Sequence, residues 1–582
     1  MSKTNSRTLG TSRQKGKFMR RINLMLLGPA AIFAVLLGLN CSFCHSQTQV
    51  SLNRVPDAGV LDAQVTQIDA LVKQVWDDYE LKPSRDATES EWCRRVHLDI
   101  IGRIPTVKET KDFLAARGEG KRKQLVDKLL YDDQYTEEFA RNWTTIWTNL
   151  LIGRTGGTDN DSMISREGMQ KFLRDSFARE KPYDKFVYEL VTATGSTTPG
   201  EKDFNGATNF LIDKVNEEKA SLATSETTKT FLGLQVQCTQ CHNHPFNDWK
   251  QQKYWEMNAF FRQVKAGTGG MRARDGAVAR LTDKNFRGED GKHPEKAEIF
   301  YELRNGLLKV AYPVFVDGQE INPSGFVETV NRRKELADLM IKSPFFAKSM
   351  VNRTWAHFLG YGFTSPVDDL GPHNAPSNPE LLEYLAQEFR SSEFDIRQLM
   401  SWIALSKPYA LSSRRTRANE KDDPLLGESP KFTHFYIRQM EAEQLYESLL
   451  TASEAQSQGS YEEHEKNKNT WLRQFATAFG TDEGQESTTF NGTIPQILMM
   501  FNGELIRNST KVTKGTMINR LTSMGNYNKA VEELFVKGLS RKPSGKEKEL
   551  AKSILSARGD TAEALKDVWW VVLNTNEFIF NH

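Results

Sequence analysis

A cysteine and histidine motif offers the clearest chemistry in this sequence. Cys238 and Cys241 are separated by two residues, and His242 follows immediately; residues 41–45 repeat the pattern. With five cysteines and ten histidines in 582 residues, composition alone does not produce two copies of C-x-x-C-H. In c-type haem attachment two thiols bond to the haem vinyl groups and the adjacent histidine binds the iron. The spacing therefore predicts covalent haem c at residues 238–242.

The first copy of the motif is in a poorer context. Cys41, Cys44 and His45 almost adjoin an apolar run at 22–39, which leaves no chain to wrap a haem. Cleavage of a signal peptide after Ser46 would remove this copy altogether. We therefore expect the second copy to be the functional one.

Two other interpretations of the second copy remain open. The two thiols could form a short-loop disulfide in an oxidising compartment. They could instead bind zinc together with His242 or His244, and Cys93 and His97, one helical turn apart, could complete that site. The sequence does not decide between haem, zinc and disulfide.

A haem at this motif would have His242 as its first iron ligand. His244 is too close in sequence to reach the opposite face of the same iron. Met257, His97 and His357 are candidates for a sixth ligand, and the iron could also be five-coordinate.

The N-terminus predicts export. Basic residues between positions 3 and 21 precede the apolar run 22–39, a pattern typical of a signal peptide or a membrane anchor. We expect a periplasmic or cell-envelope location with residues 22–39 as the membrane contact. The net charge is +2, and without the basic N-terminus the chain is mildly acidic, which argues against a nucleic-acid partner.

The elements that position the motif are expected to be mainly α-helical. We expect a signal or anchor at 1–46, a linker at 47–61, a helical domain at 62–265 and another at 326–582. Between them, residues 266–325 are glycine-rich, and alternation around Asn305-Gly306 predicts a small β-hairpin connector. A helix starting at 225–228 should lead into the motif with an apolar face formed by Phe231, Leu232, Leu234 and Val236. Trp143 and Trp147 are expected in the core.

A second candidate site lies in the C-terminal half. Arg353, His357, Asp368 and Asp369 could form an acid/base or metal site, although an arginine and aspartate ion pair would satisfy the same charges. Ser343-Pro344 should open the helix that carries the first two residues.

The remainder of the C-terminal half predicts architecture rather than chemistry. The spacing of Ser377 and Glu380 predicts a capping box with Ser377 as the N-cap. The polar stretches 414–431 and 453–490 are expected to be loops.

Several stretches of the chain resemble a known pair of domains. The segments RRVHLDIIGRIPT (94–106) and FLGLQVQCTQCHNHPFNDWKQQKYWEMNAFF (231–261) are similar to the planctomycete cytochrome C-like domain of unknown function. Residues 343–386, LSKPYALSS (405–413) and the ending WWVVLNTNEFIFNH resemble its usual C-terminal companion, another planctomycete domain of unknown function. The resemblance covers roughly 62–265 and 326–582, but it supplies no mechanism.

Two functions follow as hypotheses. The first is an envelope redox protein that carries haem on residues 238–242 and exchanges electrons with an unknown redox or envelope partner. The second is a non-haem binding or structural envelope protein with a zinc site or a disulfide at the same place. No G-x-x-x-x-G-K-[ST], G-x-S-x-G or H-E-x-x-H motif occurs, so the sequence leaves open whether the protein is an enzyme.

Overall fold

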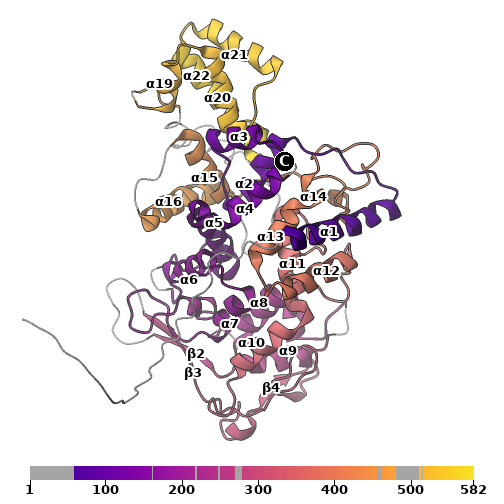
Figure 1. The fold of residues 1–582 in the computed structure, drawn as a ribbon. Coiled ribbons are helices and arrows are strands. Elements are labelled where there is room, and N and C mark those ends of the chain that lie inside the picture. Colours follow the sequence, from indigo (N-terminus) through magenta and orange to yellow (C-terminus); the bar gives the residue numbers. More distant parts are fainter. Residues whose placement is uncertain are drawn as a thin grey trace, which may run out of the picture. The chain divides into compact units, whose positions relative to one another are not determined.

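The computed structural model describes residues 58–582, apart from 119, 160–161, 217–218, 247–248, 269–277, 455–459, 480–506, 508–509 and 514. This part is mainly α-helical with a few short strands (Figure 1), which confirms the predicted fold class. The predicted signal or anchor, residues 1–46, lies outside the described residues. Within the residues that are described, no helix is long and apolar enough to cross a membrane.

The first half of the chain is a series of amphipathic helices separated by short loops. They are α1 (Ala58–Asp78), α2 (Glu89–Ile101), α3 (Val107–Ala115), α4 (Lys121–Tyr131), α5 (Asp133–Ile152), α6 (Arg166–Ala178), α7 (Tyr183–Thr192), α8 (Ser221–Leu232) and α9 (Gln251–Asn258), with 3-10 turns η1 (Gly206–Phe210), η2 (Gln237–Gln240) and η3 (Ala259–Phe261). Trp143 and Trp147 on α5 are buried, as the sequence predicts.

Helix α2 illustrates how sequence signals set the helix ends. Thr88 and Glu91 form a capping box at its start, in which each side chain accepts a hydrogen bond from the other's backbone N–H. The helix ends at Gly102, whose φ is +74°. A Cβ there would also lie 2.3 Å from Asn142 Oδ1, so both backbone and packing require glycine.

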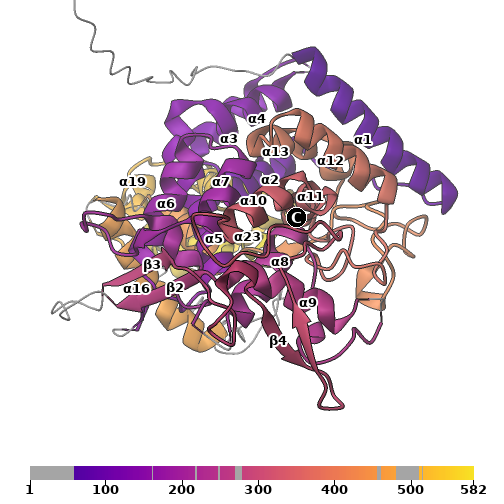
Figure 2. The ribbon, with the colours of Figure 1, turned by 90° about the horizontal axis from the view of Figure 1, so that it is seen from below.

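The strands are short and pair in antiparallel fashion. β1 (Gly195–Ser196), β3 (Ala279–Asp283) and β2 (Val264–Thr268) form one sheet in that order, and Ala266 pairs with Leu281. β4 (Ile299–Glu302) and β5 (Leu308–Ala311) form the predicted hairpin, with Gly306 at φ +80° in its turn. This hairpin lies beside α9 (Figure 2).

The second half of the chain is again helical. Its helices are α10 (Arg332–Lys342), α11 (Pro344–Leu359), α12 (Pro379–Ser391), α13 (Ile396–Leu405), α14 (Lys407–Ala410), α15 (Ala442–Ser453), α16 (Tyr461–Phe479), α19 (Met517–Thr522), α20 (Tyr527–Leu539), α21 (Gly545–Arg558), α22 (Thr561–Leu573) and α23 (Asn576–Ile579), with turns η4 (Pro294–Lys296) and η5 (Pro424–Leu426). Strands β6 (Arg438–Gln439) and β7 (Phe580–Asn581) pair with each other and join the C-terminus to the body.

The described part of the chain has two apolar cores. The larger contains buried side chains between Ile68 and Tyr436. The smaller runs from Met440 to Phe578 and also takes Leu98 and Ile104, from α2 and the loop after it. Because α2 contributes other side chains to the larger core, this one helix belongs to both cores.

Three local expectations were wrong. Helix α8 begins at Ser221 rather than near 225, because Ala220 in the left-handed region ends the preceding turn. Residues 461–479 of the expected 453–490 loop are helical, since α16 packs against α15. Ser343 does open α11, but the N-cap of α12 is Asn378 and not Ser377.

This last correction gives a prediction with an internal control. The side chain of Asn378 accepts a hydrogen bond from the backbone N–H of Leu381 at 3.0 Å, so Asn378→Ala should destabilise α12 by about 1 kcal/mol. The hydroxyl of Ser377 has no hydrogen-bond partner, so Ser377→Ala should change stability by a few tenths of a kcal/mol or less. Hydrogen exchange at Leu381 would distinguish the two variants, and equal protection would contradict this assignment.

Candidate functional site

The C-x-x-C-H segment forms an exposed turn at the end of α8. The helix stops at Gly233, and the apolar residues expected before the motif, including Leu234 and Val236, are buried. The chain then enters η2, which contains Cys238 and is followed directly by Cys241; both cysteines are exposed and neither is in a disulfide. Buried apolar residues thus anchor the turn while both thiols reach the surface.

Hydrogen bonds from α9 hold this turn in place. Gln251 is buried, and its Nε2 donates to the backbone oxygen of Gln240 at 3.0 Å. The indole N–H of Trp255 donates to the same oxygen at 3.1 Å. The backbone N–H of Gln251 also donates to Asn243 Oδ1 at 3.0 Å. The cysteines are therefore carried on a braced turn rather than on a loose loop.

The tautomer of His242 is fixed by a local contact. Its Nδ1 lies 2.6 Å from the backbone oxygen of Asn243. A carbonyl oxygen can only accept, so Nδ1 carries the proton and donates. In this tautomer the lone pair is on Nε2, which is the usual arrangement for a histidine that binds a metal.

His244 lies beside residues from the second half of the chain. Its backbone N–H donates to the oxygen of Trp249 at 2.8 Å, and its ring centroid is 5.1 Å from that of His373. Burial lowers the pKa of His244, and the neighbouring His373 lowers it further. His373 Nε2 is in turn 3.0 Å from Asp369 Oδ2. Two distant segments therefore meet at the motif.

The two aspartates of the second candidate site lie on this side of the protein. Asp368 pairs with Lys229 Nζ at 3.3 Å and accepts a hydrogen bond from Gln235 Nε2 at 2.8 Å. Asp369 accepts from the backbone N–H of Gly371 at 3.1 Å. Asp368 is thus bound to the segment that leads into the C-x-x-C-H turn, whereas Asp369 is bound within its own loop to Gly371 and His373.

His357 lies in a different environment. Its Nε2 donates to the backbone oxygen of Asp99 at 3.0 Å, and its ring packs on Trp143 with centroids 4.9 Å apart. Burial lowers its pKa. Arg353, one turn earlier on α11, acts electrostatically on the buried Tyr183. The four residues therefore do not form one site, because Asp368 and Asp369 bind neighbours of the motif whereas His357 packs against α2 and α5.

Of the proposed sixth iron ligands, Met257 and His97 are buried and His357 is partly buried. Met257 and His97 have almost no exposed surface, and His97 Nδ1 donates to the oxygen of Cys93 at 2.8 Å. Burial also raises the pKa of the Cys93 thiol. Across the residues that are described, no three histidine, cysteine, aspartate or glutamate side chains are grouped so as to hold a metal ion.

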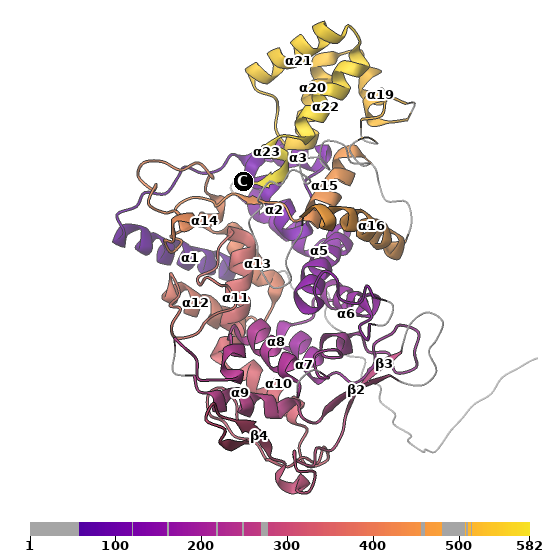
Figure 3. The ribbon, with the colours of Figure 1, turned by 180° about the vertical axis from the view of Figure 1, so that it is seen from behind.

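A separate pocket lies between α5 and the pair α15 and α16, which Figure 3 shows near one another. We call it the Glu447 pocket; its volume is about 390 Å³. Its lining consists mostly of polar and charged residues: Ile101, Gly102, Arg103, Gln134, Glu137, Glu138, Arg141, Asn142, Thr145, Glu443, Gln444, Glu447, Leu450, Thr451, His464 and Lys468.

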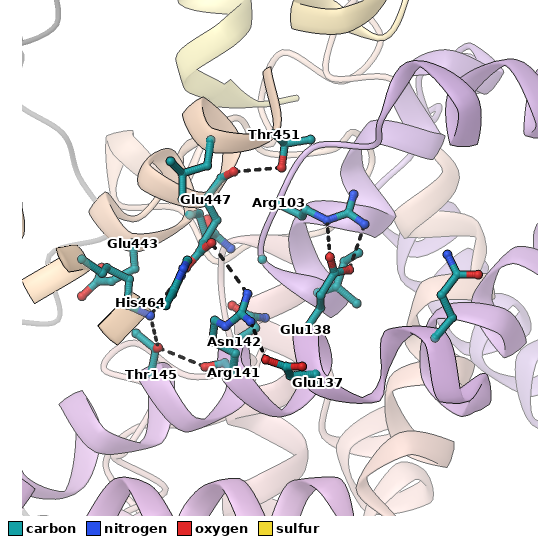
Figure 4. A pocket seen from close by; sticks show the side chains of 16 residues that line it. Arg103, Glu137, Glu138, Arg141, Asn142, Thr145, Glu443, Glu447, Thr451 and His464 are labelled. Atoms are coloured by element: carbon teal, nitrogen blue, oxygen red, sulfur yellow. Dashed lines mark hydrogen bonds and ion pairs between the residues drawn. The ribbon is translucent and has the colours of Figure 1, made fainter. Parts of the chain in front are cut away.

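Glu447 is the electrostatic centre of this pocket (Figure 4). Its Oε1 lies 2.7 Å from His464 Nε2 and 3.6 Å from Lys468 Nζ, and Arg141 is 3.9 Å from its Oε2. Burial alone would raise the pKa of Glu447. The hydrogen bond with His464 and the cationic neighbours outweigh burial and lower this pKa to about 2.

Sequence reasoning missed both His373 and the Glu447 pocket. His373 follows Asp369 by four residues, so the short Asp-Asp-Leu-Gly-Pro-His run was a usable signal. Glu447 and His464 belong to a helix and to a stretch expected to be a loop, and their partner Arg141 lies far away in the chain. No spacing rule connects such residues.

Comparisons with known proteins identify two family models along the chain. Residues 67–266 match PSCyt2, described as a protein of unknown function (DUF1549), and residues 332–555 match PSD1, described as a protein of unknown function (DUF1553). No curated protein and no solved structure matches the chain. The C-x-x-C-H turn lies in the first matched segment, and Asp369 and His373 lie in the second.

Proposed function

Because the chain belongs to the family of proteins that pair a PSCyt2 domain with a PSD1 domain, both of unknown function, we propose its role from the geometry of the C-x-x-C-H turn. The protein is an exported, cell-envelope electron carrier. It holds haem c on Cys238 and Cys241, with His242 as an iron ligand. Its partner is another redox or envelope protein.

The observation that carries this proposal is the orientation and tautomer of the His242 ring. The hydrogen bond from its Nδ1 to the oxygen of Asn243 orients the ring and leaves Nε2 as the ligand nitrogen. Both neighbouring thiols are exposed, which their reaction with a haem requires. Cys93, by contrast, is buried and is not part of a C-x-x-C-H motif.

The surroundings of the turn also fit a porphyrin. Phe246, four residues after His242, is 77% exposed, and its ring centroid is 6.1 Å from that of His244. A flat apolar macrocycle bound to the two thiols could cover such a side chain. The hydrogen bonds from Gln251 and Trp255 would keep the thiols in place during attachment.

Haem attachment at this turn requires only the addition of the two cysteine thiols to the two haem vinyl groups. Each thiol S–H adds across one vinyl double bond, so that sulfur bonds to one carbon, hydrogen goes to the other, and no oxidant is needed. The bound haem would supply one-electron transfer. The protein would contribute the two thioether bonds, the imidazole ligand and the apolar cover.

Export is part of the proposal. Attachment of this kind takes place outside the cytoplasm in bacteria, and the apolar run 22–39 after a basic stretch is the pattern that export requires. Whether this segment is cleaved or stays as an anchor does not alter the chemistry at residues 238–242.

The test is to express the full chain in an exporting host that has haem-maturation machinery. We expect a mass increase equal to one haem and a Soret band, both lost in the double Cys238→Ala, Cys241→Ala variant. A double Cys41→Ala, Cys44→Ala variant and a Cys93→Ala variant should keep both signals. His242→Ala should keep the mass increase but change the spin state seen in the absorption spectrum, because it removes a ligand and not a thioether.

An unmodified mass, in a host that matures a control cytochrome, would overturn the proposal. Zinc analysis and thiol titration of that same sample would then separate the zinc site from the disulfide. Haem that persists in the double Cys238→Ala, Cys241→Ala variant but disappears in the double N-terminal variant would move the site to residues 41–45.

A further inference from the structure

The β4–β5 hairpin ends in an exposed apolar segment. We call residues 303–310 the hairpin tip. Within it Leu307 is 52% exposed, Leu308 65% and Val310 40%. Figure 2 shows the hairpin projecting away from the neighbouring helices. Aliphatic side chains grouped on a projecting element mark a contact surface more often than single exposed leucines do.

The base of this hairpin is fixed to the body. Buried Tyr301 stacks on Trp255 of α9, with ring centroids 6.0 Å apart. Gln251 Nε2 donates to the backbone oxygen of Glu302 at 3.0 Å. In the turn itself, the backbone N–H of Gly306 donates to the oxygen of Leu303 at 2.8 Å. The leucines are therefore presented outward on an ordered element.

The charge of the hairpin tip is positive. Arg304 and Lys309 are both exposed, and residues 303–310 contain no acidic residue. Neither of these two cations has a side-chain partner among the described residues. The nearest acid in the sequence, Glu302, precedes the tip and lies opposite Leu308 in the strand register. The tip thus combines apolar side chains with two unpaired cations.

A second pair of exposed leucines shows that this combination is not general. Leu425 and Leu426 in η5 are 76% and 79% exposed, so they are at least as accessible as the leucines of the tip. Their flanking residues are Asp423 and Glu428, and residues 423–428 contain no cation. Apolar exposure is therefore common to both places, whereas positive charge is found only at the hairpin tip.

The size of the tip favours a lipid surface over a protein partner. A stable protein interface buries about 800 Å² on each partner, which requires many more side chains than three aliphatic ones on a two-stranded hairpin. A bilayer requires no matching surface. Apolar side chains enter the boundary between headgroups and acyl chains, and adjacent basic residues bind anionic headgroups.

We propose that the hairpin tip inserts into the surface of an anionic lipid bilayer. Leu307 and Leu308 enter the bilayer, while Arg304 and Lys309 bind the lipid phosphates. The apolar run 22–39, through its predicted role in export, would bring the chain to a membrane. The inference rests on the envelope location proposed above and does not depend on haem.

The test places an environment-sensitive fluorescent amino acid at position 308 of the full chain, and at position 426 in a matched chain. Both are mixed with anionic vesicles of phosphatidylglycerol and phosphatidylethanolamine, and with neutral vesicles of phosphatidylcholine. We expect a blue shift at 308 on the anionic vesicles, with quenching by lipids brominated on their acyl chains, and no response at 426. Binding through residues 22–39 would bring both probes to the vesicle but would not bury only one of them.

Charge variants of the chain with the probe at 308 test the role of the two cations. Arg304→Gln and Lys309→Gln should each raise the lipid concentration at half-maximal shift about fivefold, since each basic residue adds to the attraction by an anionic surface. The matched control is Arg417→Gln with Lys421→Gln, which removes the same two charges beside η5, where both residues are exposed. It should leave the half-maximal concentration nearly unchanged.

Leu307→Ser, with the probe at 308, tests the apolar part. It should raise the half-maximal lipid concentration about tenfold, because one of the inserted side chains is lost. The substituted positions are all on the surface, and thermal unfolding of each variant shows that the comparison is made between folded proteins.

Four results would overturn the proposal. They are no shift at 308 on anionic vesicles, equal shifts at 308 and 426, no effect of removing both tip cations, and a shift at 308 that grows with protein concentration without vesicles. The last would assign the tip to a contact between copies of the chain. The double Cys238→Ala, Cys241→Ala variant should bind vesicles like the wild type, and cell fractionation measures export separately, so failure of haem attachment or of export is distinguishable from failure at the tip.

Discussion

Asp99→Ala should destabilise the protein by about 3–5 kcal/mol, because it removes the anion from a buried network. Asp99 is fully buried and accepts hydrogen bonds from the Tyr409 hydroxyl at 2.6 Å and from Asn581 Nδ2 at 2.8 Å. It also pairs with Arg438. Without the carboxylate, a guanidinium and a hydroxyl remain in the interior without their partner.

The effect should extend to the C-terminus. Asn581 in β7 is the register partner of Arg438 in β6, so Asp99 connects α2 with both short strands. Urea unfolding followed by circular dichroism measures the loss of stability, and hydrogen exchange at Phe580 and Asn581 reports release of the strand. Asp112→Ala is the control, because its i,i+4 pair with Lys108 is exposed to solvent and should hardly change stability. Equal midpoints for the two variants would contradict this account.

Local features of the fold could be predicted from the sequence because their causes are local. The Asn305-Gly306 turn predicts the β4–β5 hairpin, since Gly306 supplies the positive φ that the turn needs. Trp143 and Trp147 are buried on α5 as their spacing indicates. The predicted N-cap of α12, Ser377, was wrong by one residue. Serine and asparagine are both good N-cap residues, and they are adjacent here at 377 and 378.

Long-range contacts could not be predicted in this way. Arg94 and Arg95 look like the polar face of α2, yet both are buried. Arg94 donates to the backbone oxygens of Gly538 and Phe578, and Arg95 donates to that of Leu411. A buried guanidinium group must be hydrogen-bonded, and here the acceptors are backbone carbonyls from distant segments. A single sequence does not reveal which distant segments come into contact.

The same distinction applies to the candidate sites. His242 and the two cysteines are adjacent in sequence, so their proximity follows from the motif alone. His373 reaches His244, and Arg141 reaches Glu447, only after the two halves of the chain have packed. The site at the C-x-x-C-H turn therefore combines a part that is visible in the sequence with a part that folding supplies, whereas the Glu447 pocket is formed by folding alone.

Glu447 should make a large contribution to acid unfolding. Its folded-state pKa of about 2 lies below the ordinary value of 4.5, so the folded state releases this proton more readily than the unfolded state. The stabilisation is therefore fully present above about pH 4.5 and is lost as the pH falls toward 2. A shift of this size corresponds to about 3 kcal/mol.

Glu447→Gln should remove this pH dependence. The amide cannot ionise, so the variant should be less stable than the wild type at neutral pH, and the difference should shrink as the pH falls toward 2. Urea unfolding measured at several pH values between neutrality and strong acid tests this. Glu137→Gln is the matched control, because its side chain is 68% exposed and forms only an i,i+4 pair with Arg141. If the stability difference between Glu447→Gln and the wild type stays constant with pH, the ion-paired Glu447 is not the group that destabilises the fold in acid.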